Sequence, residues 1–181
     1  GAGPPRDGAG VAGALDNARD RLYAARIFGP PRMSHTAFTL APEKRARLAS
    51  LYQRIAGQPL TKVLPRNSAP RLFNAGGGLF STASDYLRFC QMLLNGGELD
   101  GTRILSRRSV ELMTTSQIDN IPLPFLPGQS FGLGVAIRKA DDSTAWQGSP
   151  GTFGWSGGYN TYFRIDPRNP GIFALFSHMC F

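Results

Sequence analysis

The sequence predicts an α+β fold, with helices in the first two thirds of the chain and an antiparallel sheet at the end. Up to about residue 114, apolar residues recur at the spacing of amphipathic helices. From Phe131 onward the pattern changes to short apolar segments separated by Gly- and Pro-rich turns, and strands joined by short turns pair in antiparallel order. A chain of 181 residues, 41% hydrophobic and 18% charged, has the composition of one domain with a single core.

Residues 1–13 are mostly Gly, Ala and Pro, and this composition predicts a flexible tail before the helical part. We therefore expect the folded domain to span 14–181. A helix is expected over 14–28, because its apolar residues form a stripe that the following Gly-Pro-Pro ends. A second short helix is expected over 42–55, and residues 57–74, with three prolines, should be extended.

The clearest helix signal follows Gly76-Gly77-Gly78. Ser81 is the expected N-cap, Asp85 stands in the first turns where the helix dipole favours a negative charge, and Gly96-Gly97 ends the helix. A further short helix is expected from Ser106 to about residue 114. The expected strands are 131–138, 152–158 and a hairpin of 162–166 with 171–177.

The net charge of +8, with 17 Arg and 3 Lys, raises nucleic acid or an anionic surface as a partner. The Arg and Lys residues are scattered along the sequence and form no known nucleic-acid-binding motif. We therefore interpret them as solvated side chains of the protein surface and predict no nucleic-acid partner. The longest apolar run is Ile172-Phe173-Ala174-Leu175-Phe176, whereas a spanning helix needs about 20 residues, so no membrane span is predicted. No signal peptide is visible at the start, and cytoplasm and periplasm both stay open.

The cysteines and histidines do not form a metal or disulfide pattern. Cys90 and Cys180 each lie among apolar residues, which predicts reduced, buried thiols rather than a disulfide scaffold. His35 and His178 have no zinc-ligand spacing. We therefore predict neither a metal nor an organic cofactor.

A series of short motifs links the chain to a known family. One is Gly-Gly-Leu-Phe-Ser-Thr-Ala-Ser-Asp-Tyr at 77–86, and another is Phe-Gly-Trp-Ser-Gly-Gly-Tyr at 153–159. The others lie at residues 27–33, 36–38, 92–97, 105–113, 131–134 and 160–167. In this order they resemble β-lactamase-related serine hydrolases, which include class C β-lactamases, family VIII carboxylesterases and D-alanyl-D-alanine peptidases. The resemblance covers roughly residues 20–178 and implies a β-lactamase/transpeptidase-like fold whose N-terminal part is missing here.

The resemblance also implies acyl-enzyme chemistry, in which a Ser-x-x-Lys pair supplies nucleophile and base, beside a second Tyr or Ser motif and a Lys-Thr-Gly-like triplet. No Ser-x-x-Lys, Tyr-x-Asn or Ser-x-Asn occurs in the chain. In the family these motifs precede the stretch that resembles 27–38. We therefore expect the chain to be the C-terminal part of a serine hydrolase and to be inactive alone. The alternative is a non-catalytic binding or regulatory relative.

The resemblance places the third motif at Trp155-Ser156-Gly157. Many esterases of the family have Trp-Gly-Gly where β-lactamases have Lys-Thr-Gly, so Trp155 favours a carboxylesterase acting on a small-molecule ester or amide. A β-lactamase or D-alanyl-D-alanine peptidase is the alternative. A Gly pair on an edge strand lets substrate approach the backbone, so the Gly158 N–H is a candidate oxyanion donor. The structural alternative is that Trp155 is a packed aromatic and that Gly157-Gly158 relieve crowding or form a bulge.

Three further residues are candidates for substrate contact. Ser81 borders the cleft in the family as well as being the expected helix cap. Tyr159 and Asn160 follow the triplet and are expected to line the acyl pocket, although Tyr159 could instead cover the sheet.

The sequence departs from the family pattern at two places, and each departure predicts a local difference in structure. Relatives commonly have Pro-Leu-Gly-Met where this chain has Pro30-Pro31-Arg32-Met33, which puts the local turn in doubt. The sequence also ends directly after the last predicted strand. One sheet face is therefore expected to be exposed. The residues expected on it are Phe163, Ile165, Phe173 and Leu175. The oligomeric state stays open.

Overall fold

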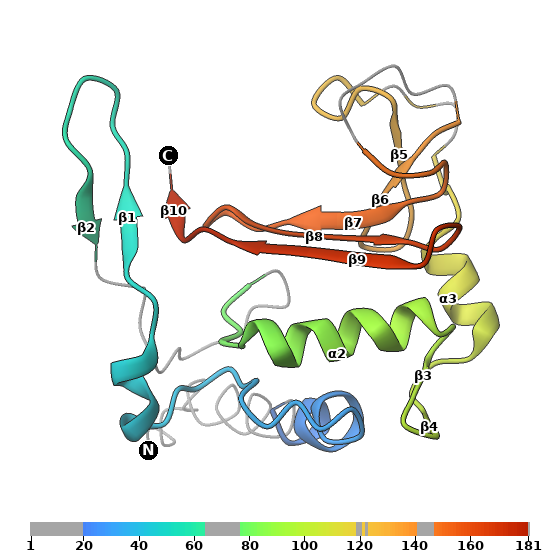
Figure 1. The fold of residues 1–181 in the computed structure, drawn as a ribbon, viewed down its shortest axis with the longest axis horizontal. Coiled ribbons are helices and arrows are strands. Elements are labelled where there is room, and N and C mark those ends of the chain that lie inside the picture. The colour runs from blue at the N-terminus through green and yellow to red at the C-terminus, as the bar shows by residue number, and fades with distance from the viewer. Residues whose placement is uncertain (1–19, 64–76, 119–120, 122, 141–146, 181) are drawn as a thin grey trace, which may run out of the picture.

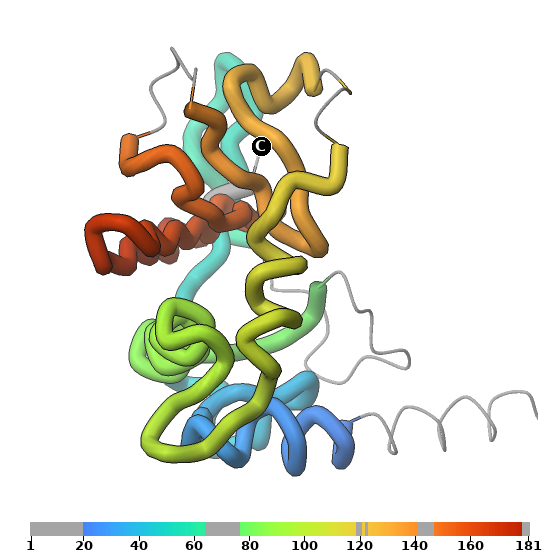
Figure 2. Tube along the Cα trace, turned by 90° about the vertical axis from the view of Figure 1, so that its right-hand side faces the viewer, coloured from blue at the N-terminus to red at the C-terminus, as the bar shows by residue number. Residues whose placement is uncertain are grey.

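The computed structural model describes residues 20–63, 77–118, 121, 123–140 and 147–180. The predicted tail, residues 1–13, lies outside them, as do the first residues of the expected helix 14–28. Figure 1 shows a sheet above one long helix, with the N-terminal segment below that helix, and Figure 2 shows the same layers turned by 90°. The predicted α+β class is confirmed.

The sheet that dominates the fold has five antiparallel strands in the order β5-β6-β7-β8-β9. Two smaller sheets are the hairpin β3–β4 and the set β10-β1-β2, in which β10 is parallel to β1. The helical elements are η1 (Ala24–Phe28), η2 (Pro42–Arg47), α2 (Ala83–Leu94) and α3 (Arg107–Met113). The strands are β1 (Leu51–Gln53), β2 (Thr61–Val63), β3 (Glu98–Leu99), β4 (Thr102–Arg103), β5 (Gln129–Phe131), β6 (Ala136–Arg138), β7 (Phe153–Ser156), β8 (Thr161–Asp166), β9 (Gly171–Phe176) and β10 (Met179–Cys180).

The main core lies between α2 and one face of the five-stranded sheet (Figure 1). Phe153, Ile165 and Ile172 lie opposite one another on β7, β8 and β9, so they present one apolar row to the helix. The buried members of this core are Cys90, Met92, Leu93, Leu99, Val110, Val135, Ile137, Phe153 and Ile165. Burial of these side chains is the main force that holds α2 on the sheet.

The start of α2 differs by one residue from the sequence-based expectation. The N-cap is Thr82 rather than Ser81, because the Thr82 hydroxyl accepts the Asp85 N–H at 3.2 Å. Asp85 is buried, and its carboxylate accepts the His35 N–H at 2.7 Å and the Thr36 hydroxyl at 2.9 Å. The carboxylate therefore joins the helix start to a segment about fifty residues earlier in the chain.

The expected helix 42–55 is present only in its first half. A 3-10 helix ends at Arg47, and the chain then enters β1, which pairs with β2 on one side and β10 on the other. Strand pairing with a distant segment overrides the local preference here, and the sequence pattern does not reveal such a partner. The predicted extended region 57–74 contains β2, and its residues from 64 onward lie outside the described part of the chain.

The strand predictions hold for β8 and β9, but two others change. The expected strand 131–138 is a hairpin of β5 and β6, because Gly134 has a positive φ of 86° and turns the chain. The expected strand 152–158 shortens to β7, residues 153–156, and the glycines that follow belong to a turn. The short helix predicted from Ser106 is confirmed as α3, with Ser106 as its N-cap.

The expected exposed sheet face is half correct. Phe173 and Leu175 are exposed, at 57% and 47%, on the side away from α2. Phe163 and Ile165 lie on the opposite face, where Ile165 is fully buried in the core and Phe163 packs against it. Phe163 of β8 pairs with Ala174 of β9, and Arg164 pairs with Phe173. Paired residues lie on the same face of the sheet, so the odd-numbered residues of β8 lie on one face and the odd-numbered residues of β9 lie on the other.

The turn at Pro30-Pro31-Arg32-Met33 forms despite its departure from the family pattern. Arg32 takes the left-handed conformation at φ 56°, where the family has Gly. The Arg32 N–H donates to Gly29 O and the Met33 N–H to Phe28 O, while the Arg88 guanidinium donates to Pro31 O. Backbone hydrogen bonds therefore hold a conformation that a non-Gly residue disfavours.

We expect Asp85→Ala to lower the free energy of unfolding by about 3 kcal/mol, because it removes two charge-assisted hydrogen bonds and leaves the His35 N–H without its acceptor. Asp85→Asn, which keeps one acceptor oxygen, should lose about half as much. The measurement is urea-induced unfolding of the chain, with the exposed Glu43→Ala as the control within about 0.5 kcal/mol of wild type. Equal stability of all three variants would contradict the anchoring role of Asp85.

The buried thiol of Cys90 predicts a pH dependence at the alkaline side. Burial raises the pKa of Cys90 from its ordinary value of 9.0 to about 12, so the folded state keeps a proton that the unfolded state releases. Stability is therefore fully present below pH 9 and falls between pH 9 and 12. In Cys90→Ala the slope of unfolding free energy against pH over this window should be shallower by about 1.4 kcal/mol per pH unit, the value for one proton. An unchanged slope would contradict this assignment.

Candidate functional site

The predicted third motif lies where β7 ends. β7 is an inner strand, not the edge strand that the sequence predicted, but β6 pairs only with its first half, Phe153 and Gly154. Trp155 and Ser156 have β8 alone as a strand neighbour, through Phe163 and Tyr162. The second half of β7 is therefore open on one side, as a strand needs to be if substrate is to approach its backbone.

A four-residue turn, Gly157 to Asn160, joins β7 to β8. The Asn160 N–H donates to Gly157 O at 2.9 Å and the Gly157 N–H to Thr161 O at 2.8 Å. Asn160 takes the left-handed conformation at φ 59°, which closes the hairpin in the manner of a turn followed by a bulge. The left-handed residue of this turn is Asn160, not Gly157 or Gly158, where the structural alternative placed a bulge.

Two N–H groups of this turn, those of Gly158 and Tyr159, have no acceptor among the described residues, and Gly158 is the one of the two without a side chain. The residue is exposed, and a Cβ built on it would meet nothing within 4 Å. The two glycines before it differ. A Cβ on Gly154 would lie 2.0 Å from Phe163 O, and one on Gly157 would lie 2.4 Å from Thr161 Oγ1. Crowding explains Gly154 and in part Gly157, but it does not explain Gly158.

Trp155 is both packed and accessible. Its ring meets that of Phe131 edge-to-face, with centroids 4.9 Å apart and an interplanar angle of 82°, yet 36% of the residue is exposed. Tyr159 is 40% exposed. Trp155 and Tyr159, which precede and follow Gly158 in the sequence, thus both have accessible aromatic rings.

Ser81 lies just before α2, and its hydroxyl hydrogen-bonds to that of Thr36 at 2.7 Å. Thr36 also donates to Asp85, and Phe80 exchanges two backbone hydrogen bonds with Ala37. Ser81 is therefore held at the surface by the Asp85 anchor rather than by a capping role.

Aromatic contacts bring the start of α2 to the motif-bearing end of the sheet. Tyr86, in the first turn of α2, meets Phe163 edge-on at 5.3 Å and Phe176 at 6.0 Å between ring centroids. Phe163 is the direct strand partner of Trp155. Figure 1 accordingly shows the first turn of α2 and the β7–β8 turn at the same end of the molecule. Burial, and then the neighbouring Cys90, raise the pKa of the Tyr86 phenol, so it is neutral in the fold.

Three residues of this region were not singled out from the sequence. Thr36 binds Ser81, Phe131 packs on Trp155, and Ser177 donates its hydroxyl hydrogen bond to Asn160 O at 3.0 Å. Thr36 and Phe131 lie in two of the short motifs noted in the sequence, but each of the three residues meets its partner across a long sequence separation, which a local pattern does not reveal.

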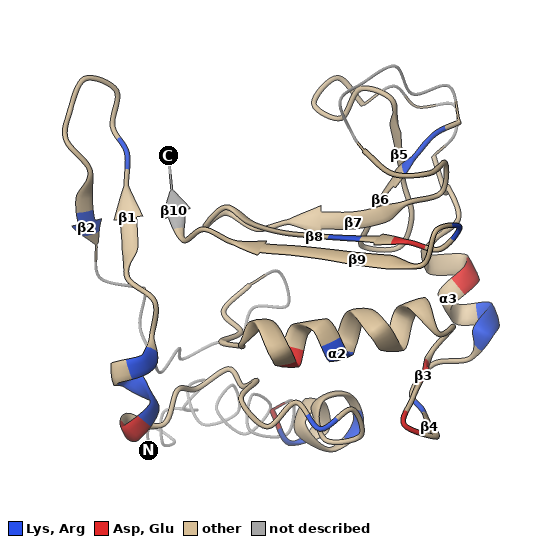
Figure 3. Ribbon diagram, in the orientation of Figure 1, with Lys and Arg blue, Asp and Glu red and all other residues tan. Residues whose placement is uncertain are grey.

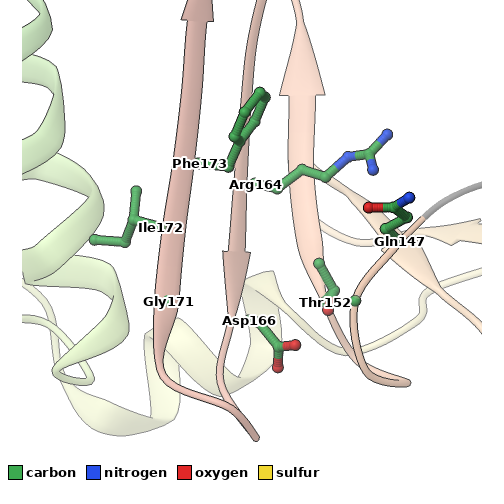
Figure 4. Close-up of a pocket in the computed structure, with 8 residues that line it drawn as sticks. Gln147, Thr152, Arg164, Asp166, Gly171, Ile172 and Phe173 are labelled. Carbon is green, nitrogen blue, oxygen red and sulfur yellow. The ribbon is translucent and has the colours of Figure 1, made fainter.

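A separate hollow of about 420 Å³ lies at the other end of β8 and β9 (Figure 4). Its two charged groups are already engaged. Arg164 donates to the Tyr162 hydroxyl and lies 4.7 Å from that ring, and Asp166 accepts the N–H groups of Ser149, Arg168 and Asn169. Desolvation opposes the charge of Asp166, but these donors outweigh it and hold the pKa of that carboxyl below its ordinary value. This hollow is remote from the residues predicted to act on substrate.

Within the described ranges, no group of three or more His, Cys, Asp or Glu side chains could hold a metal ion. The described helices also include none with the length and apolar character to cross a bilayer. Cys90 is buried with a free thiol, as predicted, and the side chain of Cys180 lies outside the described part.

The sequence matches the family model described as Beta-lactamase over residues 8–179. The chain belongs to the beta-lactamase family. Protein Rv1367c of Mycobacterium tuberculosis is 36% identical over an alignment 173 residues long, which covers 88% of this chain and 43% of that protein. This beta-lactamase family chain therefore spans less than half the length of that relative.

Solved structures confirm the β-lactamase/transpeptidase-like fold. The LovD6 mutant of simvastatin synthase from Aspergillus terreus superimposes with a TM-score of 0.73 and 23% identity, over 88% of this chain and 44% of that one. EstCE1, described as a hydrolase with promiscuous acyltransferase activity, gives a TM-score of 0.69 and 21% identity, over 90% and 46% of the two chains. The predicted family and fold are confirmed, and the fold is present here as a partial domain.

The glycines of this beta-lactamase family chain differ in what they tolerate. We expect Gly154→Ala to destabilise the chain by about 3 kcal/mol or to prevent folding, because its Cβ would overlap the Phe163 carbonyl. Gly158→Ala, which places its Cβ in open space, should change the free energy of unfolding by less than about 0.5 kcal/mol. Thermal unfolding followed by circular dichroism measures both. A Gly158→Ala variant as unstable as Gly154→Ala would show that Gly158 is there for packing.

Proposed function

We propose that the chain is the C-terminal part of a carboxylesterase-like serine hydrolase that works through an acyl-enzyme. In this proposal the Trp155-Ser156-Gly157 triplet forms one wall of the active site and the Gly158 N–H is one donor of the oxyanion hole. The observation that carries it is the exposed Gly158 N–H, which has no acceptor among the described residues, on a turn held by its own hydrogen bonds. A fixed, unengaged donor stabilises developing negative charge without reorganisation.

The roles of the neighbouring residues follow from chemistry. Trp155 offers an apolar surface where a Lys would bind a substrate carboxylate, which favours an uncharged ester. Tyr159 and Asn160 would line the acyl pocket, and Ser81 would contribute a hydroxyl to the opposite wall. The serine nucleophile and its base would come from residues outside this sequence, since no Ser-x-x-Lys occurs in it.

The absence of a Ser-x-x-Lys motif from this sequence also favours a second candidate, a non-catalytic relative with a binding or regulatory function. That candidate keeps the accessible Trp155 and Tyr159 as a ligand surface but has no nucleophile anywhere in the protein. The coding sequence upstream of Gly1 separates the two, because a Ser-x-x-Lys there supports the hydrolase.

The kinetic test uses the chain together with its upstream part. Gly158→Val keeps the backbone N–H but adds a branched side chain that would tilt this donor or block the substrate carbonyl. It should therefore lower turnover of a short-chain ester by about 10²–10³, the usual effect of losing one oxyanion donor, with an unchanged melting temperature. Trp155→Lys should raise kcat/KM for carboxylated β-lactams relative to uncharged esters, because it adds a cation at the acyl site. The 181-residue chain alone, treated with a fluorescent phosphonate or penicillin probe, should take up no covalent label.

Three results would refute the proposal. They are normal turnover by Gly158→Val, a wild-type preference for penicillins or cephalosporins over esters, and stoichiometric labelling of a serine in the chain alone. The last result would identify a nucleophile that the motif search does not recognise.

A further inference from the structure

The β1–β2 hairpin projects from the body of the protein at the side opposite α3 (Figure 1). Its strands pair over three residues each, and every residue from 54 to 62 is exposed. The Gln58 N–H donates to Ile55 O at 3.0 Å, and Gly57 at φ 76° completes the turn. The described residues anchor the hairpin only at its base, where the Tyr52 N–H donates to His178 O and β1 pairs with β10.

Large apolar side chains lie on this projection. Tyr52, Ile55 and Leu60 are 41%, 46% and 57% exposed, and the last two flank the turn. A hairpin this short has no hydrophobic core of its own. Apolar groups gathered at a projecting tip indicate a contact surface rather than a packing element.

Basic side chains line the same side of the molecule. Residues 42–63 contain five bases, Lys44, Arg45, Arg47, Arg54 and Lys62, against one acid, Glu43, which gives a net +4 of the chain's +8. Figure 3 shows η2, β1 and β2 along one side, with blue segments on η2, on the loop that follows β1 and on β2. Arg45, Arg47, Arg54 and Lys62 are exposed, and none of them is in an ion pair within the described part of the chain. The sequence analysis treated the basic residues as scattered, but half of the net charge lies in this one continuous segment, and the structure exposes it on one side of the molecule.

We infer that η2 and the β1–β2 hairpin form a docking surface for an anionic lipid bilayer. Exposed bases attract anionic headgroups, and Ile55 and Leu60 at the turn reach into the boundary between headgroups and acyl chains. Charge complementarity together with aliphatic tips favours lipid over nucleic acid, because single strands bind on aromatic platforms and Tyr52 is the one exposed aromatic of the hairpin. The surface is independent of the proposed hydrolase activity and needs no residue of the candidate active site.

The expected binding is reversible and sensitive to salt. Each base near an anionic surface contributes a factor of about five to partitioning, and the contribution falls as the Debye length shortens. Ile55 and Leu60 add an apolar contribution that salt does not screen. The two kinds of contact can therefore be separated by experiment.

The test is flotation of the 181-residue chain with vesicles of phosphatidylcholine alone and with vesicles that also contain phosphatidylglycerol. We expect binding to the second kind only, with release at high salt. Arg45→Gln with Arg47→Gln should weaken it by about 25-fold, from two factors of about five. The matched charge control is Arg107→Gln with Arg108→Gln on α3, which should bind like wild type.

The apolar contribution has its own matched pair. Ile55→Glu with Leu60→Glu should abolish flotation, whereas Phe125→Glu with Leu133→Glu, two residues 73% and 54% exposed elsewhere in the chain, should lower it far less. Circular dichroism and melting temperature, equal to wild type for every variant, show that each variant is folded.

Four results would overturn the inference. They are no binding to anionic vesicles, equal binding to neutral ones, equal losses in the hairpin and control variants, and binding that the Ile55 and Leu60 changes leave intact. The last result, combined with salt-sensitive binding to duplex DNA or RNA, would assign the surface to nucleic acid instead.

Discussion

Asp85 is the residue on which the arrangement of this structure depends. Its buried carboxylate accepts a backbone N–H from His35 and a hydroxyl from Thr36, while its own N–H bonds to the Thr82 cap. Asp85 thus takes part in the capping of α2 through its backbone N–H and holds the segment at His35 and Thr36 through its carboxylate. Because α2 carries Cys90, Met92 and Leu93 into the main core, its position sets how the sheet is covered. A charged group is well suited to this role, since hydrogen bonds to carboxylates are stronger than neutral ones.

The candidate site inherits its geometry from that anchor. Tyr86 follows Asp85 directly and packs edge-on against Phe163, the strand partner of Trp155. Ser81 precedes the helix and binds Thr36, which Asp85 also holds. Asp85 thus lies next to the residue that packs toward the β7–β8 turn and shares Thr36 with the segment before α2. The turn itself is kept in shape by Asn160 in the left-handed region and by the Ser177 hydroxyl on the Asn160 carbonyl.

The two regions with proposed roles differ in how they are supported. The β7–β8 turn is tied by backbone hydrogen bonds at both ends and is flanked by the main core, which favours the fixed geometry that catalysis needs. The β1–β2 hairpin is attached at its base and exposed elsewhere, which suits a peripheral surface that meets a broad partner. The proposed oxyanion donor, the Gly158 N–H, thus lies in a turn that hydrogen bonds hold in shape. The proposed lipid-binding residues lie on an exposed hairpin, where many weak contacts are sufficient.

The sequence by itself determined the family, the α+β class and the long amphipathic helix, because these are written in local patterns and in the order of short motifs. It placed Gly157 and Gly158 in a strand, whereas the structure puts them in the turn that follows β7. Tertiary structure decided the rest. β1 replaced an expected helix because it finds β2 and β10, and Thr82 replaced Ser81 as the cap because Ser81 is bound by Thr36. Ile165 became buried rather than exposed because α2 covers its face of the sheet. In each case the deciding contact joins residues far apart in the chain, and the free energy of such a contact depends on a neighbour that no local window of sequence contains.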